Sequence, residues 1–332
     1  MKNLTTAILI AAAIQTCAYA EDNDVYVIPS GRSVGVKLYT DGLTVAGVEK
    51  ITGADGKSVS PAADAGIKKG DIIYSVNGVA LSTVEQLAGE INKSPDSVRL
   101  EVRRGCESMS ITADPAEASD NALKLGMWVR DSTAGIGTIT YYQPENNTYA
   151  ALGHGICDSD TGNILTVKSG NIQQCNDLTV KKSERGAPGE LDAVFNGPEL
   201  GVVELNSSAG IYGKMNSDEY VRGNPVKIAP DIEVHEGEAY IMTDAAGGGV
   251  EYYTVELQKL KPGSDDTKGI VFKVTDERLK EATGGVVKGM SGAPIIQEGK
   301  LVGAVTHVFV NDPMKGYGIF IENMLAQAEK LG

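Results

Sequence analysis

Large aromatic side chains are scarce in this chain, whose 332 residues include four Phe and one Trp against 40 Gly. This composition disfavours a helix bundle and favours a β-rich architecture with many turns. Positive charge is scarce too, since 30 Lys and Arg stand against 44 Asp and Glu, and no run of Lys or Arg exceeds two residues. A nucleic-acid-binding surface needs concentrated positive charge, so we exclude nucleic acid as a partner. The length favours two domains over one.

Metal-ligating residues are also few, with four Cys and three His in the whole chain. The sequence contains neither CxxC nor HExxH, the spacings typical of zinc sites, so we predict no metal and no other cofactor. Three cysteines follow the first twenty residues, and an odd number leaves at least one thiol unpaired within the chain. They are Cys106, Cys157 and Cys175, and pairing of Cys157 with Cys175 stays open.

Residues 1–20 have the pattern of an export signal. Lys2 supplies a positive start, residues 7–14 form an apolar run of eight, and Ala18-Tyr19-Ala20 matches a cleavage site. The run is shorter than the roughly 20 apolar residues that span a membrane. We therefore predict an exported protein. The alternative is an uncleaved anchor, with membrane association through this segment.

Residues 30–113 have the pattern of one compact module. Ser60 and Pro61 are typical of a helix start, residues 69–78 predict a buried strand that ends in an Asn-Gly turn, and residues 82–91 carry apolar side chains at helical spacing. The run from Pro61 to Gly78 closely resembles the signature of bacterial PDZ domains. The resemblance implies a small α/β domain that binds peptide C-termini or internal strands by β-augmentation. Its carboxylate-binding loop would be Ser33, Val34, Gly35 and Val36. The alternative is a PDZ scaffold that only supports the neighbouring domain.

A second domain follows a polar, alanine-rich linker at residues 114–124. From 125 to 332, short strand-like runs alternate with Gly, Asn and Pro turns, and helical periodicity returns only at residues 321–331. Such spacing favours a β-sandwich or a pair of barrels.

The hexapeptide Gly289-Met290-Ser291-Gly292-Ala293-Pro294 carries the clearest chemical signal. It resembles the Gly-Asp-Ser-Gly-Gly-Pro of chymotrypsin-like serine peptidases, with Met290 in place of Asp. The glycines allow a tight turn whose backbone N–H groups converge on a developing oxyanion, here those of Gly289 and Ser291. The alternative is a glycine-rich hairpin with an incidental serine.

A nucleophilic serine needs a base. His154 stands between Gly153 and Gly155, after an apolar run. Because these two neighbours are small, we expect its imidazole to be open to a cleft. His307 lies in a strand-like run, where packing within the sheet is the favoured interpretation. His235 has charged neighbours and is expected at the surface.

Together these motifs resemble the SpoIVB (stage IV sporulation protein B) peptidases, exported serine peptidases with a PDZ domain. The similar blocks include residues 28–38, 125–132, 151–154 and 289–322. The resemblance implies a mainly β protein, in which a small α/β PDZ domain precedes a chymotrypsin-like double β-barrel peptidase domain. It implies Ser291 as nucleophile, His154 as base and Asp276 as the acid of the triad.

The acid is the weakest of these assignments. Asp276 lies only 15 residues before Ser291, whereas chymotrypsin-like enzymes place the acid nearer the histidine. Asp158 and Asp192 are alternative orienting residues. Asp276 has a structural alternative as well, the N-cap of a helix over residues 277–282.

The resemblance also implies a role in sporulation signalling. Such an enzyme crosses the inner forespore membrane into the intermembrane space, cleaves itself and cuts a SpoIVFA-like membrane regulator, which triggers pro-sigma factor processing. Met290 cannot form the activating ion pair that Asp makes in digestive relatives, so control must come from another element such as the PDZ domain. The competing hypothesis is a non-catalytic PDZ adaptor whose peptidase-like domain only binds.

Overall fold

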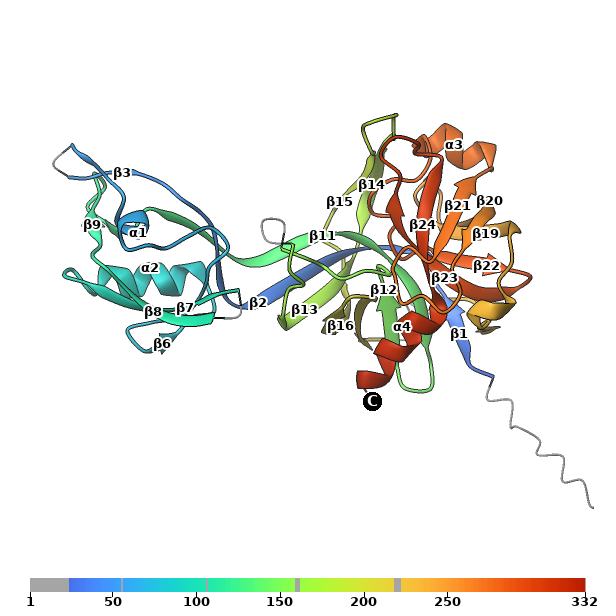
Figure 1. The fold of residues 1–332 in the computed structure, drawn as a ribbon, viewed down its shortest axis with the longest axis horizontal. Coiled ribbons are helices and arrows are strands. Elements are labelled where there is room, and N and C mark those ends of the chain that lie inside the picture. Colours follow the sequence, from blue (N-terminus) through green and yellow to red (C-terminus); the bar gives the residue numbers. More distant parts are fainter. Residues whose placement is uncertain (1–23, 55, 106, 159–161, 218–221, 332) are drawn as a thin grey trace, which may run out of the picture.

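A computed structural model describes residues 24–331 except 55, 106, 159–161 and 218–221. The predicted signal segment and Cys106 lie outside the described residues. Strands make up most of the ordered elements, and Figure 1 shows a small module joined by two long strands to a larger body. The predicted mainly β class is confirmed.

Six strands form the first barrel of the larger body. They pair antiparallel in the order β11-β12-β17-β16-β13-β2, and β2 pairs back onto β11, which closes the ring. The strands are β2 (Ser33–Val48), β11 (Met127–Gln143), β12 (Thr148–Ala151), β13 (Val167–Gln174), β16 (Glu199–Ser207) and β17 (Gly210–Met215). Strands β1 (Tyr26–Pro29) and β18 (Val226–Lys227) extend the sheet beside β11, and β14 (Asn176–Lys181) pairs with β15 (Glu190–Val194).

A second closed barrel has the strand order β19-β20-β21-β24-β23-β22. Buried side chains such as Tyr253, Phe272 and Ile295 fill it, and Met290 lies in the same core. Its elements are β19 (Gly237–Thr243), β20 (Glu251–Leu260), β21 (Ile270–Val274), α3 (Glu277–Thr283), β22 (Pro294–Gln297), β23 (Lys300–Val308), β24 (Lys315–Phe320) and α4 (Ile321–Ala328), with 3₁₀ turns η2 (Asp231–Glu233) and η3 (Glu329–Leu331). The larger body is therefore the expected double β-barrel.

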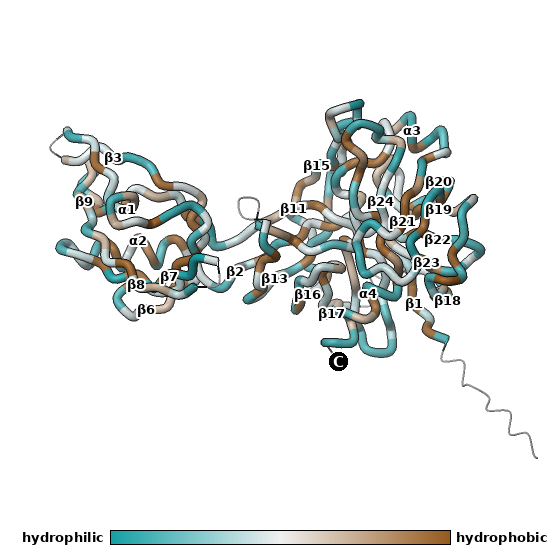
Figure 2. The backbone as a smooth tube through the Cα atoms, viewed as in Figure 1, coloured by the Kyte–Doolittle hydropathy of each residue, from teal (hydrophilic) through white to brown (hydrophobic). Residues whose placement is uncertain are grey.

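The smaller module packs helices on its own portion of the 12-stranded sheet, which continues from the first barrel through β2. This portion contains the distal half of β2, then β5 (Ile72–Val76), β7 (Val98–Arg104) and β8 (Glu107–Ala113), and Leu87 and Ile91 of α2 (Val84–Asn92) join its buried core. Figure 2 shows alternating hydrophobic and hydrophilic stretches along its chain. The remaining elements are β3 (Ile51–Thr52), β4 (Ser58–Val59), α1 (Pro61–Asp64), β6 (Val79–Ala80), β9 (Ala116–Glu117) and β10 (Leu123–Lys124).

The local predictions for this module are confirmed. Pro61 occupies the first turn of α1 behind Ser60, and α2 overlaps the predicted helix. Asn77 and Gly78, with φ of 50° and 81°, form the two-residue loop between the paired Val76 and Val79. Such left-handed pairs suit a tight hairpin turn.

The domain boundaries differ from those expected at residues 30 and 125. Residues 33–38 of β2 pair with β11 on one edge and β13 on the other, inside the first barrel. Residues 43–48 of the same strand belong to the smaller module, which is thus inserted between the two barrel portions of β2 and β11. The expected linker at 114–124 contains the paired strands β9 and β10. Of the described helices, none is long and apolar enough to cross a membrane.

Candidate active site

The turn that carries Ser291 is built on two glycines in the left-handed region, Gly289 at φ 98° and Gly292 at φ 97°. A side chain at Gly292 would place its Cβ 2.0 Å from the carbonyl oxygen of Thr138, so only glycine fits there. The half-buried Ser291 donates its hydroxyl to the carbonyl oxygen of Thr306 at 2.8 Å. In the described part of the chain, no hydrogen bond engages the N–H of Gly289 or of Ser291. Both donors are therefore available to an oxyanion.

His154 follows β12 in a loop where Leu152 and Gly153 both have positive φ. Its Nδ1 lies 3.0 Å from the carbonyl oxygen of Gly155. A carbonyl oxygen can only accept, so in the neutral ring Nδ1 carries the proton and Nε2 keeps its lone pair. Burial of the imidazole lowers the pKa of His154 below its usual value and favours that neutral form. This is the protonation state that a general base requires.

His307 on β23 stacks at an angle against His154, with the ring centroids 5.0 Å apart and the planes tilted by 35°. Withdrawal from water, followed by the neighbouring His154 and Lys268, lowers the pKa of His307 to about 4. His307 lines the same cleft as His154, which the sheet-packing interpretation did not anticipate.

A cleft of about 580 Å³ joins these groups. Ser291, His154, His307 and Gly289 all line it, although no hydrogen bond between the described side chains joins Ser291 to either imidazole. The other described lining residues are mainly aliphatic, and Lys288 is the only one of them with a charged side chain. The aliphatic ones are Ile136, Leu152, Ile156, Val286, Val287, Val305, Val308 and Val310.

Comparison with known proteins identifies the family. The family model described as SpoIVB peptidase S55 matches residues 121–325, more than half of the chain, and a PDZ domain model matches residues 54–104. The chain belongs to the SpoIVB peptidase S55 family. The family is one of peptidases, and this chain carries a PDZ domain as well.

Two further similarities are shorter. Serine protease HTRA1 of Xenopus tropicalis is 36% identical over 58 residues, which are 18% of this chain and 13% of that protein. The chain thus matches about one eighth of the length of that relative. The crystal structure of the PDZ domain of an SdrC-like protein from Listeria monocytogenes is 21% identical, with a TM-score of 0.23, and the match covers 27% of this chain and 90% of that one.

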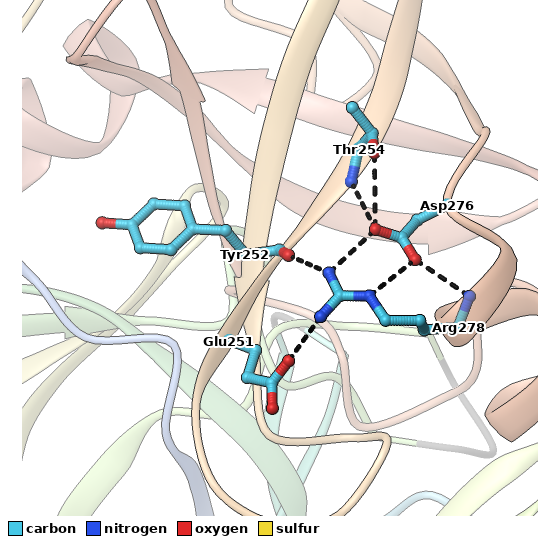
Figure 3. Close-up of polar contacts among 5 residues, drawn as sticks. All are labelled: Glu251, Tyr252, Thr254, Asp276 and Arg278. Carbon is cyan, nitrogen blue, oxygen red and sulfur yellow. Dashed lines mark hydrogen bonds and ion pairs between the residues drawn. The ribbon is translucent and has the colours of Figure 1, made fainter.

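Asp276 of this SpoIVB-family peptidase lies outside the cleft lining. It is the N-cap of α3, and its Oδ1 accepts the backbone N–H of Arg278 at 2.9 Å (Figure 3). Its Oδ2 pairs with the Arg278 guanidinium at 3.0 Å and accepts from Thr254. The hydrogen bond from Arg278 is the main cause that lowers the pKa of Asp276 to about 2. Both oxygens accept these hydrogen bonds, so the structure has Asp276 as the N-cap of α3, and none of the hydrogen bonds between the described residues joins it to His154.

The two alternative acids do not lie against His154 either. Asp158 is buried and forms an ion pair with Arg130 at 2.5 Å. Asp192 is exposed on β15. None of the described residues that line the cleft is acidic, and the hydrogen bond of His154 Nδ1 to Gly155 takes the place that a triad acid would fill.

The predicted carboxylate-binding loop of the PDZ domain is also misplaced. Ser33, Val34, Gly35 and Val36 are buried in β2, and because both edges of the strand are paired, no peptide can add there. Ser33 additionally donates its hydroxyl and its N–H to Asp244. The prediction is wrong because these residues belong to the first barrel.

A different segment borders a groove beside α2. This groove is lined by Val84, Leu87, Ala88 and Ile91 of the helix and by residues 123–127 and Val129. Gly126 has a φ of 73°, and its backbone lies so close to Glu49 that a Cβ would be 2.6 Å from the Glu49 carbonyl oxygen. Leu125-Gly126-Met127 repeats the apolar-Gly-apolar pattern of Val34-Gly35-Val36. That pattern was the signal that sequence reasoning could have used.

Two cysteines are described by the structure, and one of them, Cys157, lines the cleft. Cys157, exposed at the cleft, and the half-buried Cys175 are both free thiols, so the open pairing between them does not occur. Burial raises the pKa of Cys175 to about 11. Among the described residues, no group of three His, Cys, Asp or Glu side chains is arranged to hold a metal ion.

Proposed function

We propose that Ser291 is the nucleophile and His154 the general base of this endopeptidase. The observation that carries the proposal is the convergence of Ser291, a neutral His154 and two unengaged N–H groups on one cleft. Attack requires the Ser291 hydroxyl to exchange its hydrogen bond to Thr306 for one to His154 Nε2.

The reaction then proceeds by acyl transfer. Ser291 Oγ bonds to the scissile carbonyl carbon as its proton passes to His154 Nε2, and the carbonyl oxygen becomes an oxyanion that accepts from the N–H groups of Gly289 and Ser291. Histidinium next protonates the leaving amine as the C–N bond breaks. Water repeats the sequence on the acyl ester and frees Ser291.

The biological substrate we propose is protein. Membership of the SpoIVB family supports a signalling peptidase of sporulation that cleaves itself and a SpoIVFA-like membrane regulator. The export pattern of residues 1–20 supports action outside the cytoplasm, in the forespore intermembrane space. The PDZ domain would recruit substrate through the groove between α2 and residues 123–129.

The test is hydrolysis of a quenched fluorescent peptide, together with self-cleavage of the full chain. Ser291→Ala should lower turnover by several orders of magnitude, as removal of the nucleophile does in other serine peptidases, without changing the melting temperature. The matched control Ser207→Ala changes a serine outside the cleft lining and should hydrolyse normally. Normal self-processing by purified Ser291→Ala would overturn Ser291 as the nucleophile, and a folded wild type inert towards both substrates would favour the alternative of a non-catalytic PDZ adaptor.

A further inference from the structure

Thr138 contacts the Ser291 turn from outside the cleft. It lies on β11, is fully buried and makes three hydrogen bonds to the two loops of the site. Its N–H donates to the Ser291 carbonyl oxygen at 2.8 Å, and its hydroxyl donates to the Gly289 carbonyl oxygen at 2.8 Å. Its own carbonyl oxygen accepts the N–H of Leu152 at 3.2 Å.

These bonds fix two peptide planes, the one between Gly289 and Met290 and the one between Ser291 and Gly292. The peptide between Gly289 and Met290 is held at its oxygen by the Thr138 hydroxyl and at its nitrogen by the Val287 carbonyl oxygen, 3.2 Å away. The carbonyl of Ser291 is held by the Thr138 N–H. The N–H groups of Gly289 and Ser291 belong to the peptides next to these two, so they project from a backbone that cannot rotate freely.

The Leu152 bond extends this control to the base, since Leu152 stands two residues before His154. The backbones of Thr138, Gly292 and Leu152 are tightly packed. A Cβ on Gly292 would lie 2.0 Å from the Thr138 oxygen and 2.5 Å from the Leu152 nitrogen. One buried residue thus joins the nucleophile turn to the histidine loop.

We propose that Thr138 is a positioning residue that sets the oxyanion hole and the Ser291–His154 alignment. The inference rests on the proposed function of Ser291 and His154. The Thr138 hydroxyl touches no reacting atom and acts through the Gly289 carbonyl.

Thr138→Val tests the hydroxyl, since valine has nearly the same shape but no donor. We expect kcat for a short peptide to fall by about 10²-fold, because a small misplacement of the hole is that costly, with KM changed by no more than about threefold. Thr138→Ser restores the donor and should return kcat to within a few fold of wild type.

Thr140→Val is the matched control. Thr140 lies two residues along β11, is equally buried, and its hydroxyl has no hydrogen-bond partner among the residues that the structure describes. This variant should keep wild-type kcat. Should Thr138→Val fail to fold, as judged by its melting curve, Thr138→Ala carries the same comparison.

Hydrogen exchange of the amides in residues 286–293 supplies a readout that does not depend on activity. We expect exchange there to quicken by roughly tenfold in Thr138→Val and to stay unchanged in Thr140→Val. A wild-type kcat in folded Thr138→Val, or unchanged exchange in that segment, overturns the inference. Wild-type protein that is inert towards peptides would overturn the proposed function instead, and the exchange comparison would still decide the role of Thr138.

Discussion

His154 has its base form set by two neighbours, the Gly155 carbonyl and the apolar wall of the cleft. Burial against the apolar wall favours the neutral imidazole and is the larger effect, while the Gly155 carbonyl, which by itself raises the pKa of His154, selects the tautomer with a free Nε2. A triad acid would stabilise the imidazolium and raise its pKa, whereas desolvation lowers the pKa of His154.

We therefore predict that the acid limb of kcat/KM has a midpoint below the usual histidine value of about 6.5. Activity should rise with pH through that midpoint and reach its plateau before neutrality, because the lowered pKa leaves His154 neutral there. The measurement is kcat/KM between pH 4 and 8. A midpoint clearly above 6.5 would indicate a carboxylate beside the imidazole and contradict the geometry.

A substitution at Asp276 tests whether this residue is a helix cap or the acid of a catalytic triad. Asparagine caps a helix about as well as aspartate but cannot pair with Arg278, so Asp276→Asn should keep near-normal kcat and lose about 1 kcal/mol of stability at pH 7. The pKa of Asp276 is lowered to about 2, so its charge stabilises the folded state above the unfolded value of 3.8. That stabilisation is lost as the pH falls towards 2.

The difference in melting temperature between wild type and Asp276→Asn should accordingly shrink on acidification from pH 5 to pH 2. A loss of kcat beyond about 10²-fold without a change in melting temperature would restore Asp276 as the acid of a triad.

Strands β2 and β11 each run through both the first barrel and the PDZ domain. The PDZ domain can therefore be removed only at a point that leaves the barrel portions of both strands in place. Deletion of residues 30–113 would take Ser33–Leu38 out of the first barrel and open its ring. Tyr39 and Ser132 face each other across the antiparallel pair where the module begins. A two-residue Asn-Gly turn in place of residues 40–131 would join them as a tight hairpin.

We predict that this hairpin variant folds and hydrolyses a short peptide at a rate within a few fold of wild type. Cleavage of a protein substrate and self-cleavage should fall at least tenfold, because the groove is gone. The measurement is kcat/KM for both substrates. Equal effects on peptide and protein would mean that the module is a scaffold.

The groove itself can be blocked in the intact chain. Ala88 is exposed on α2 and lines the groove, so Ala88→Arg should weaken binding of hydrophobic peptides by about tenfold in a fluorescence polarisation titration. Gly89→Arg is the matched control, because it adds the same side chain one position along, outside the groove lining and with open space around it. Equal affinities for the two variants would remove residues 123–129 and α2 as the peptide site.

Across the whole molecule, the features that could be predicted from the sequence are those that depend on residues close to one another in the chain. Pro61 in the first turn of α1, the Asn77-Gly78 turn and the apolar stripe of α2 are local patterns, and each occurs as expected. The meeting of Ser291 and His154 in one cleft followed from the family resemblance, since 136 intervening residues hide it from any local pattern.

The predictions that differ from the structure concern residues whose position depends on contacts between segments far apart in the sequence. Val34-Gly35-Val36 and Leu125-Gly126-Met127 have the same local pattern, and only the strand pairing places the first in the barrel and the second beside α2. Asp276 suited both a helix cap and a triad, and Arg278 with Thr254 occupies its carboxylate. His307 was assigned to sheet packing because no sequence signal shows which face of β23 meets His154.

The central claim is that Ser291 is activated by His154 in this cleft. Labelling with a fluorophosphonate, followed by mass spectrometry of the digested protein, tests it most directly. The account predicts a single phosphonylated residue, Ser291, in wild type, no label in Ser291→Ala, and labelling slowed by at least 10²-fold in His154→Ala. An unlabelled Ser291 in folded wild type, or equal labelling rates in wild type and His154→Ala, would contradict it.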